Sequence, residues 1–600
     1  MKRCKKDYGT EWKETCAQVP NHLVELKEEA KNNGLIKKAV LAGTAVTAAA
    51  VGVAAVKKHS QRKAERAMTM VKKGREGERQ AYLIGGGLAS LSTAAYLIQD
   101  AGFHGENIHI MEGMDILGGS NDGAGTLQEG FVCRGGRMLN EETYENFWDL
   151  FKTIPSLDWP GKSVTEEILN FDHLHPTHAQ ARLVDRYGVI QDVSSMQFNN
   201  KDRILMTKLL ATPEEKLDNV TIEEWFAESP HFFTTNFWYM WQTTFAFQKW
   251  SSAFEFRRYM NRMILEFPRI ETLEGVTRTP YNQYESVILP LKAYLDGFGV
   301  DFSIKATVKD LDFKEDSITV TDIHISENGK ERTIHLEEGD ICIMTNGCMT
   351  DCATLGDLKT PAAYQPEKPI SGELWKNIAA KKPGLGNPDP FFTKPEQTNW
   401  ESFTVTMRGN KLLKMIEQFS GNIPGSGALM TFKDSSWLMS IVVAAQPHFK
   451  AQDSDTTIFW GYGLYTDAIG DYVKKPMREC TGEEMLLELL GHLHFEKETK
   501  DILESVVNVI PCMMPYIDSQ FQPRAMSDRP KVVPEGSTNF AMISQFVEIP
   551  EDMVFTEEYS VRAARIAVYE LLGISKKICP VTPYNRNPKV LAVAAKTMMR

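Results

Sequence analysis

The chain has 600 residues and a net charge of −12, from 67 Lys and Arg against 79 Asp and Glu, with 42% hydrophobic and 10% aromatic residues. This length suggests about three to five structural units with a large buried core. The composition is that of a folded protein, which excludes collagen and disordered chains. The acidic balance argues against sequence-independent binding of nucleic acid, because neutralising phosphates requires an excess of Lys and Arg.

The nine cysteines are scattered along the chain, are odd in number and form no CxxC pair. This pattern supports neither a disulfide framework nor a structural metal site. A reducing compartment is the better interpretation. We therefore expect a cytoplasmic protein without a bound metal.

Residues 1–78 are predicted to form an N-terminal extension. Within it, Ala39–Val56 carries no charge and is flanked by two lysines on each side. The stretch is near the lower length limit of a transmembrane helix, but its Ala, Gly and Thr content makes it only weakly hydrophobic. We favour a helix packed on the protein or on a membrane surface, with a membrane span and a poorly ordered tail as alternatives.

A βαβ unit follows the extension. A short apolar strand at Tyr82–Ile84 leads into the glycine turn Gly85–Ser90 (GGGLAS), then a helix rich in Ala and Leu, then a second strand at Ile108–Met111 that ends in Glu112. Glu112 lies at the roughly 20-residue distance of the dinucleotide-binding fingerprint. The pattern predicts nucleotide binding, and a glycine turn in an unrelated α/β fold is the alternative.

Each residue of this fingerprint has an expected task. Gly85 allows the tight turn, and Gly87 lets the backbone approach a pyrophosphate at the positive end of the helix dipole. Ser90 replaces the third glycine and is still small enough for close helix packing. Glu112 is expected to accept hydrogen bonds from an adenosine ribose.

Two further glycine clusters, at 118–125 and 134–137, favour FAD over NAD. Large flavoproteins bring such backbone against the diphosphate and the flavin, although either cluster alone is also typical of a surface turn. Later in the chain, a buried strand ends in a turn near 346, and the chain returns to the cofactor before its final helix. The cofactor-binding candidates in these segments are Gly118, Gly119, Ser120, Gly136, Asn346 and Ser544.

The order of the patterns predicts an α/β protein: a Rossmann-type FAD-binding domain with large helical and mixed-sheet substrate-binding insertions. The FAD-binding domain is expected to comprise three segments, 79–155, 285–355 and 535–575. Residues 156–284 are predicted to be a helical, aromatic-rich lid over an apolar ligand, although aromatic stripes are also typical of plain core. Residues 356–534 are predicted to be a substrate-binding region, and 576–600 an amphipathic C-terminal tail.

Several long strings together resemble one family, the FAD-dependent oleate hydratases, also called myosin-cross-reactive antigens. The resemblance runs from about residue 79 to the end of the chain. The strings include GGSNDGAG at 118–125, RGGR at 134–137, TTFAFQ at 243–248, YNQYES at 281–286, TFKDSSW at 431–437, FWGYG at 459–463 and GSTN at 536–539.

The resemblance implies addition of water across the cis double bond of a long-chain unsaturated fatty acid, without net redox change. It implies FAD as a scaffold and electrostatic partner beside the double bond. Tyr259 looks like the family's catalytic tyrosine, and Gln283 looks like a residue that holds the end of the fatty acid. A buried core phenol and a turn-stabilising amide are the ordinary alternatives.

One departure from the family concerns the catalytic carboxylate. Many members carry Glu directly after the RGGR run, where this chain has Met138, whose thioether cannot accept a proton. Either Glu141 or Glu142 supplies the carboxylate, or water is placed without it; the two acids are also typical of a first helical turn. Thr431, Ser436 and His448 are further polar candidates for the substrate site.

Alternative functions remain open at this point. A redox flavoprotein, such as an amine oxidase or a desaturase or isomerase of lipids, shares the glycine clusters, and linoleate is an alternative substrate for hydration or isomerisation. A fatty-acid-binding flavoprotein without activity is a third interpretation. The basic, apolar tail at 587–600 predicts peripheral contact with a membrane, with a solvated helix end as the alternative. A homodimer is one candidate assembly.

Overall fold

The computed structural model describes residues 79–121, 123–134, 138–427 and 429–600. The chain divides into two compact units, and the described residues all belong to the second, Gly74–Arg600. The predicted N-terminal extension with Ala39–Val56, and the cofactor candidate Gly136, lie outside the described residues.

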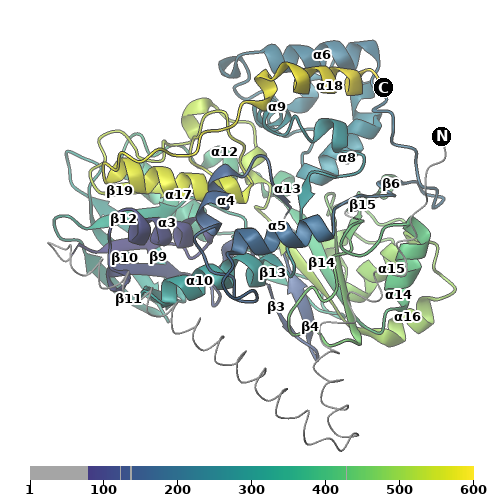
Figure 1. The fold of residues 1–600 in the computed structure, drawn as a ribbon, viewed down its shortest axis with the longest axis horizontal. Helices are drawn as coiled ribbons and strands as arrows, with labels where there is room; N and C mark the ends of the chain where they lie inside the picture. Colours follow the sequence, from purple (N-terminus) through teal and green to yellow (C-terminus); the bar gives the residue numbers. More distant parts are fainter. Residues whose placement is uncertain (1–78, 122, 135–137, 428) are drawn as a thin grey trace, which may run out of the picture. The chain divides into compact units, whose positions relative to one another are not determined.

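A five-stranded parallel sheet organises the nucleotide-binding part, in the order β19-β12-β1-β2-β8. Its strands are almost continuously apolar, as expected for a parallel sheet that is covered on both faces. Helices α3 and α17 pack against each other and against β12 and β19 (Figure 1). The strands are β1 Ala81–Ile84, β2 Ile108–Glu112, β8 Asp301–Ile304, β12 Ile341–Thr345 and β19 Phe540–Ile543.

A second, seven-stranded sheet has the order β13-β18-β14-β17-β16-β15-β6, and its neighbours are antiparallel except for β15 and β6. The long central strands β14, β17 and β18 come from the segment 356–534, whereas β6 and β13 come from outside it. The strands are β6 Leu183–Val184, β13 Thr354–Leu355, β14 Trp400–Arg408, β15 Leu429–Phe432, β16 Ser440–Val442, β17 Thr456–Gly463 and β18 Val506–Met514.

Smaller sheets connect these parts. A three-stranded antiparallel sheet follows β8 and contacts helix α11, and the hairpin β3–β4 packs on β14 and β18. The strands are β3 Gly123–Thr126, β4 Gly130–Cys133, β5 Leu139–Asn140, β7 Val276–Thr277, β9 Ala306–Phe313, β10 Val320–Glu327 and β11 Lys330–His335.

Helices fill the segment between β6 and β7, where α8 contributes a cluster of buried aromatic rings. Ser or Thr capping residues accept hydrogen bonds at the starts of α5, α7, α8 and α9, which fixes where these helices begin. The α-helices are α3 Leu88–Gln99, α4 Glu145–Phe151, α5 Val164–Leu174, α6 Asn200–Ala211, α7 Ile222–Trp225, α8 Asn236–Phe245, α9 Ala253–Arg262, α10 Leu289–Asp296, α11 Ile370–Lys381, α12 Asp389–Phe392, α13 Pro395–Thr398, α14 Lys411–Ser420, α15 Gly482–His492, α16 Thr499–Ser505, α17 Glu557–Leu571 and α18 Pro588–Met598.

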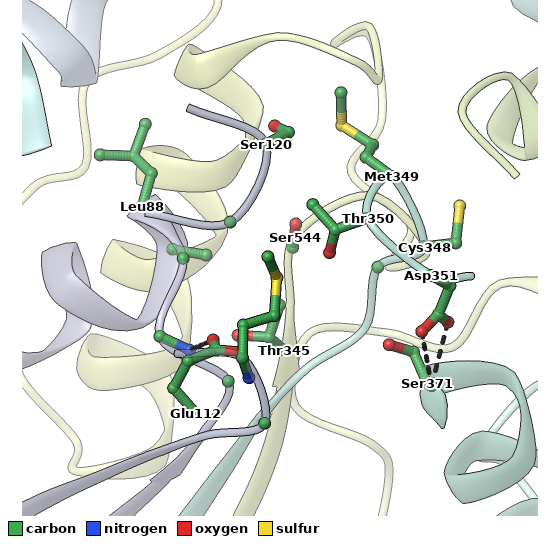
Figure 2. A pocket seen from close by; sticks show the side chains of 18 of the residues that line it. Leu88, Glu112, Ser120, Thr345, Cys348, Met349, Thr350, Asp351, Ser371 and Ser544 are labelled. Carbon is green, nitrogen blue, oxygen red and sulfur yellow. Dashed lines mark hydrogen bonds between the residues drawn. The ribbon is translucent and has the colours of Figure 1, made fainter. Parts of the chain in front are cut away.

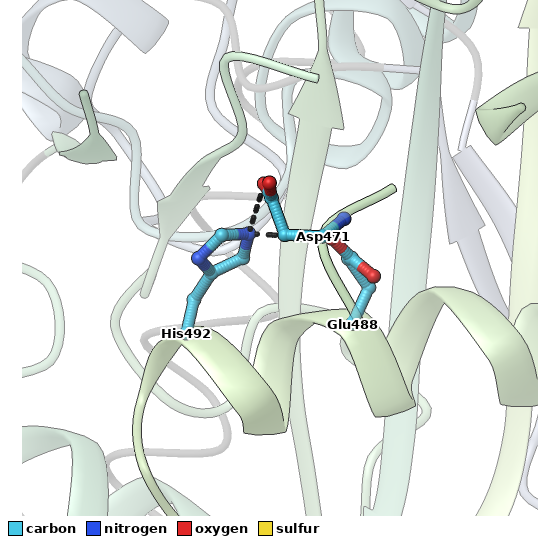
Figure 3. A group of neighbouring side chains, drawn as sticks. All are labelled: Asp471, Glu488 and His492. Atoms are coloured by element: carbon cyan, nitrogen blue, oxygen red, sulfur yellow. Dashed lines mark hydrogen bonds and ion pairs between the residues drawn. The ribbon is translucent and has the colours of Figure 1, made fainter. Parts of the chain in front are cut away.

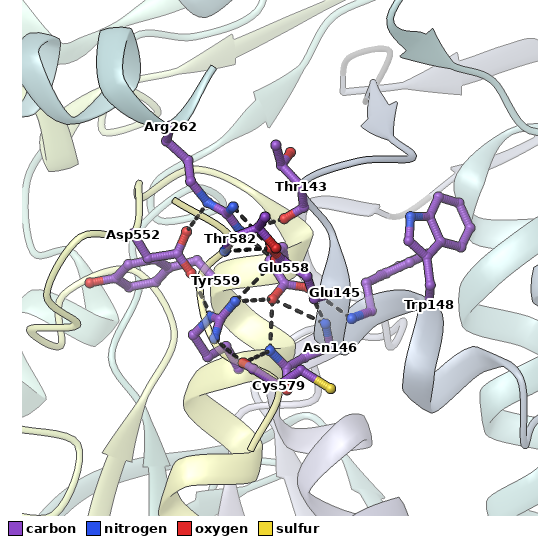
Figure 4. Close-up of polar contacts among 12 residues, drawn as sticks. Thr143, Glu145, Asn146, Trp148, Arg262, Asp552, Glu558, Tyr559, Cys579 and Thr582 are labelled. Atoms are coloured by element: carbon purple, nitrogen blue, oxygen red, sulfur yellow. Dashed lines mark hydrogen bonds and ion pairs between the residues drawn. The ribbon is translucent and has the colours of Figure 1, made fainter. Parts of the chain in front are cut away.

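A buried ionic network ties α4, α9 and α17 together (Figure 4). Asp552 accepts hydrogen bonds from Arg262 at 3.1 Å and from Arg562 at 2.7 Å. Glu558 of α17 accepts backbone N–H bonds at the start of α4, and Glu145 pairs with both arginines. Because each of these side chains has an oppositely charged partner, the network can hold α9 on α4 and α17 without isolated buried ions.

None of the helices in the described ranges combines the length and the hydropathy needed to cross a membrane. The domain boundaries proposed from the sequence stay predictions, although β1, β2, β8, β12 and β19 all lie inside the three segments assigned to the cofactor domain.

Candidate functional site: two adjoining pockets

A glycine-lined pocket lies at the carboxyl ends of the parallel strands (Figure 2), where ligands bind in open α/β sheets. Its walls come from the β1–α3 turn, the end of β2, the 118–121 segment, the start of β9, the loop after β12, the start of α11 and the segments 544–545 and 555–560. Among the predicted cofactor residues, those that line it are Gly85, Gly87, Glu112, Gly118, Gly119, Ser120 and Ser544.

The glycine turn leaves room at the pocket for a ligand. Gly85 has φ +90°, a conformation that favours glycine, and α3 begins at Leu88 without a side-chain cap. A Cβ on Gly87 would meet no atom closer than 3.8 Å, so its face is open. The backbone N–H of Gly118 donates to Gly86 O at 2.9 Å, which joins the two glycine clusters.

The Glu112 carboxylate is held by backbone donors at the same turn. It accepts from Gly86 N at 2.6 Å and from Met114 N at 2.7 Å. Burial raises its pKa, and the backbone hydrogen bonds act in the opposite direction. A carboxylate offers about four acceptor positions, so these two bonds leave capacity for ribose hydroxyls.

Across the pocket from Glu112, Asp351 lies at the start of α11, where it accepts the Ser371 backbone N–H at 3.0 Å (Figure 2). Burial raises the Asp351 pKa to about 7, although backbone N–H donors at the helix start oppose this shift. The loop from 347 to 352, which includes Cys348 and Cys352, forms this wall. This loop was not predicted from the sequence, because its residues match no known binding motif.

Two other residues that were predicted to bind the cofactor, Ser90 and Asn346, lie behind the residues that line the pocket. Ser90 is fully buried, and its hydroxyl is 2.8 Å from the Thr345 hydroxyl, so it fixes α3 to β12. Asn346 is also buried, and within the described structure its side-chain amide has no hydrogen-bond partner. Ser544, which does line the pocket, has φ +77°, an uncommon conformation for a residue with a side chain.

A second, aromatic pocket shares the segment Phe555–Glu557 with the first. Its lining is mostly apolar, with a few polar groups, as in sites for small lipophilic ligands. It is formed by residues from the segments 138–144, 243–246, 259–278 and 555–557, together with the sheet residues Trp400, Leu429, Val442, Trp460 and Tyr462.

Tyr259 lines the aromatic pocket from α9 and is 1% exposed. Its hydroxyl donates to the Val554 backbone oxygen, and its ring meets Phe245, Phe247 and Phe521 edge-on. Burial raises its pKa well above 10, so the phenol keeps its proton at physiological pH. The group therefore carries a proton and is not a ready base.

Met138 lines the same pocket, while the two acids proposed from the sequence do not. Glu141 is exposed and lies 3.4 Å from His173. Glu142 pairs with Arg269 at 3.0 Å. The carboxylate that does line the pocket on this side is Glu266, which sequence reasoning missed; it is 5% exposed.

The predicted substrate-binding residues are dispersed around the aromatic pocket, and none is among the residues that line it. Thr431 is buried behind the wall and donates to Thr243, which does line it, at 3.1 Å. Ser436 donates to Asp471 at 2.9 Å. Gln283 follows Asn282, whose backbone N–H donates to the His448 carbonyl at 2.8 Å.

Arg278, which directly follows β7, also lines the aromatic pocket. This cation was not predicted from the sequence. Its Nε and Nη2 atoms are buried and have no hydrogen-bond partner among the described residues. Desolvation lowers its pKa to about 10, so it stays charged at neutral pH. Desolvation, and secondly the Arg278 charge, lower the His448 pKa to about 4, which makes that imidazole neutral.

A separate polar cluster comprises Asp471, Glu488 and His492 (Figure 3). His492 Nε2 lies 3.4 Å from Glu488 and 3.6 Å from Asp471. Three consecutive backbone N–H groups, from 471 to 473, already donate to Glu488. The cluster therefore connects α15 to the 471–473 loop and needs no ion for its geometry.

The sheet order and the two pockets define a Rossmann-type FAD-binding fold with insertions, as predicted from the sequence. The solved structure of cyclohexylamine oxidase from Brevibacterium oxydans has the same fold, with a TM-score of 0.51 and 11% identity over 82% of this chain and 99% of that chain. A likeness at this identity concerns the fold alone.

A family model described as the MCRA family matches residues 78–569, so this chain belongs to the MCRA family, and the predicted resemblance is confirmed. The linoleate hydratase of Lactiplantibacillus plantarum is 42% identical over 86% of this chain and 98% of that protein. The oleate hydratase of Streptococcus pyogenes serotype M49 is 38% identical over 83% of this chain and 85% of that protein.

Proposed function

We propose that this protein is a fatty acid hydratase, a lyase that adds water across the cis double bond of a long-chain unsaturated fatty acid such as oleate or linoleate. The names of the two relatives support this reaction. The main structural support is the arrangement of the two pockets. The aromatic pocket, with its buried phenol and buried carboxylate, adjoins the glycine-lined pocket at Phe555–Glu557. A lipid double bond can thus lie beside a cofactor.

FAD is the cofactor that fits the glycine-lined pocket. The uncapped start of α3 and the open face of Gly87 suit a pyrophosphate, and Glu112 suits a ribose. When bound, the flavin supplies an electrostatic surface beside the alkene and takes no part in net redox change. The chain's own residues orient the lipid and exclude water from its hydrocarbon chain. They also give one proton to the alkene and take one proton from water.

The head group of the substrate is proposed to meet Arg278. A carboxylate is the natural partner of a buried guanidinium whose Nε and Nη2 lack partners in the described structure. His448 and Gln283, predicted from the sequence as substrate-binding residues, belong to the segments next to it, since Arg278 influences the His448 charge. Thr431 would act behind the wall, through Thr243, whereas Ser436 donates to Asp471 in the separate polar cluster.

The experiment is product analysis in oxygen-18 water. The purified protein is incubated with oleate and, separately, linoleate, with FAD and with or without a reductant. A product heavier by one molecule of labelled water supports hydration. Oxygen consumption, or a desaturated or isomerised product without label, would instead indicate the redox or isomerase alternatives.

We further propose a cytoplasmic location with peripheral membrane contact through α18, because the substrate partitions into bilayers. A homodimer is the proposed assembly, and light scattering of the holoprotein at several concentrations tests it.

A further inference from the structure

The aromatic pocket contains a carboxylate with an unused oxygen. Glu266 is 5% exposed, and its Oε2 atom is buried without a hydrogen-bond partner among the described residues. A buried acceptor without a partner destabilises the fold, so its presence calls for an explanation. A ligand or water in the pocket would satisfy it.

The other carboxylate oxygen of Glu266 is firmly held. Asn140 Nδ2 donates to Oε1 at 2.9 Å, and Arg269 donates to the same oxygen. Asn140 is itself fixed, because its Nδ2 also donates to Gly275 O at 2.9 Å and its Oδ1 accepts from the Thr143 hydroxyl at 2.7 Å. These bonds orient the carboxylate and leave Oε2 for chemistry.

Gly275 provides the space for this carboxylate. A Cβ at that position would lie 2.1 Å from both Glu266 oxygens, so any other residue would displace them. Gly275 and Asn140 belong to paired segments, since Asn140 faces Val276 in the β5–β7 ladder. The backbone of this small sheet therefore positions Glu266 against the pocket.

Among the described residues that line the pocket, the carboxylates are Glu266 and Glu557. Glu557 accepts from Asn121 at 2.6 Å on the wall shared with the glycine-lined pocket. Met138 cannot accept a proton, and the Tyr259 phenol is already protonated at neutral pH, so neither side chain can act as the base. Glu266 is thus the pocket carboxylate that lies outside the wall shared with the glycine-lined pocket, and it can take a proton from water.

We propose that Glu266 is the general base that activates water in the hydration reaction, with Asn140 and Arg269 as positioning residues. Its Oε2 takes one proton from water while the water oxygen bonds to one alkene carbon. Tyr259 gives its hydroxyl proton to the other carbon, and the proton on Glu266 returns to the Tyr259 oxygen through solvent. One C–O and one C–H bond form, the π bond of the alkene and one O–H bond of water are broken, and nothing is oxidised or reduced.

This inference rests on the proposed hydratase function, and the first test compares single variants of the holoprotein. Glu266→Gln keeps the shape and the Arg269 bond, so we expect kcat to fall about 10²–10⁴-fold with flavin content, Tm and KM retained. Glu274→Gln, the same change on an exposed residue that pairs with His178, is the matched control and should leave kcat unchanged.

The pH profile supplies a second readout that a structural role would not move. Burial raises the Glu266 pKa, while Arg269 lowers it and Glu142 raises it. A base must be deprotonated, so wild-type kcat should fall on the acid side. Arg269→Gln should move the midpoint of this acid-side fall in kcat to higher pH, and Glu142→Gln should move it to lower pH, each by about one unit.

The outcomes separate the two proposals. If the wild type hydrates no unsaturated fatty acid, the proposed function fails. If it does, and Glu266→Gln keeps kcat within threefold, the base assignment is overturned. If Glu266→Gln does not fold, the pH profiles of Arg269→Gln and Glu142→Gln decide. Opposite shifts of the pH at which kcat falls support Glu266 as the base. No shift in that pH, or loss of activity in Glu142→Gln alone, overturns the assignment.

Discussion

At the scale of single residues, Tyr259 is the proposed proton donor, and it lines the aromatic pocket. Tyr259→Phe removes the hydroxyl and keeps the ring among its three phenylalanine neighbours. We expect kcat for hydration to fall about 10²-fold or more, with little change in flavin content or Tm. Product quantification by mass spectrometry measures this. An unchanged rate would assign proton donation to another group.

Asp351 gives a pH-dependent prediction. Its folded-state pKa is raised to about 7 from 3.8, so the fold prefers the neutral acid, and this stability is lost as pH rises from about 4 to 7. The loss amounts to about 4 kcal/mol at most. Asp351→Asn stays neutral, so its Tm relative to wild type should be higher at pH 8 than at pH 5. A difference independent of pH would contradict the raised pKa.

Local patterns predicted residues whose task is set by their own neighbours in sequence. Gly85, Gly87 and Glu112 were found this way, because the turn, the helix start and the strand end are consecutive. Glu266 and Arg278 were missed, because they reach the pocket through the β5–β7 pairing, which joins distant segments. A sequence cannot reveal which oxygen or guanidinium nitrogen is left without a partner.

At the scale of elements, the junction of β1 and α3 offers a test of the cofactor site. The space beside Gly87 is open, so Gly87→Ala should fold normally but place a methyl group where the pyrophosphate would approach. We expect flavin absorbance per chain to fall several-fold and Tm without FAD to stay within about 2 °C. Full flavin content in the variant would contradict this placement.

The elements themselves were predictable to different degrees. The buried strands β1 and β2 appear close to their expected residues, and β12 ends next to the predicted turn near 346, since short apolar runs mark all three. The two-residue strands β6 and β13 gave no such signal, because their strand character comes from pairing with distant β15 and β18. Helix α4 begins at Glu145, which leaves Glu141 and Glu142 outside it.

At the scale of the whole molecule, the C-terminal helix α18 packs beside α6 (Figure 1). Ala594 and Thr597 face inward, and Arg203 donates to the Met598 carbonyl at 2.9 Å. Leu591 and Met599, eight residues apart on one helical face, are 44% and 67% exposed. The helix is therefore docked through one side and presents an apolar side with lysines nearby.

The proposed membrane contact places this exposed side against the bilayer that holds the fatty acid. Because Lys589 and Lys596 add attraction to anionic lipids, binding to vesicles that contain an anionic phospholipid should exceed binding to zwitterionic vesicles and should weaken as salt increases. Replacing Leu591 and Met599 by Glu should reduce vesicle co-sedimentation several-fold and slow turnover of vesicle-borne oleate. Turnover of oleate dispersed in detergent should be unaffected. Leu174→Glu, an equally exposed apolar site on α5, is the control. Equal loss in the control, or no loss with the double variant, would move the membrane contact away from α18.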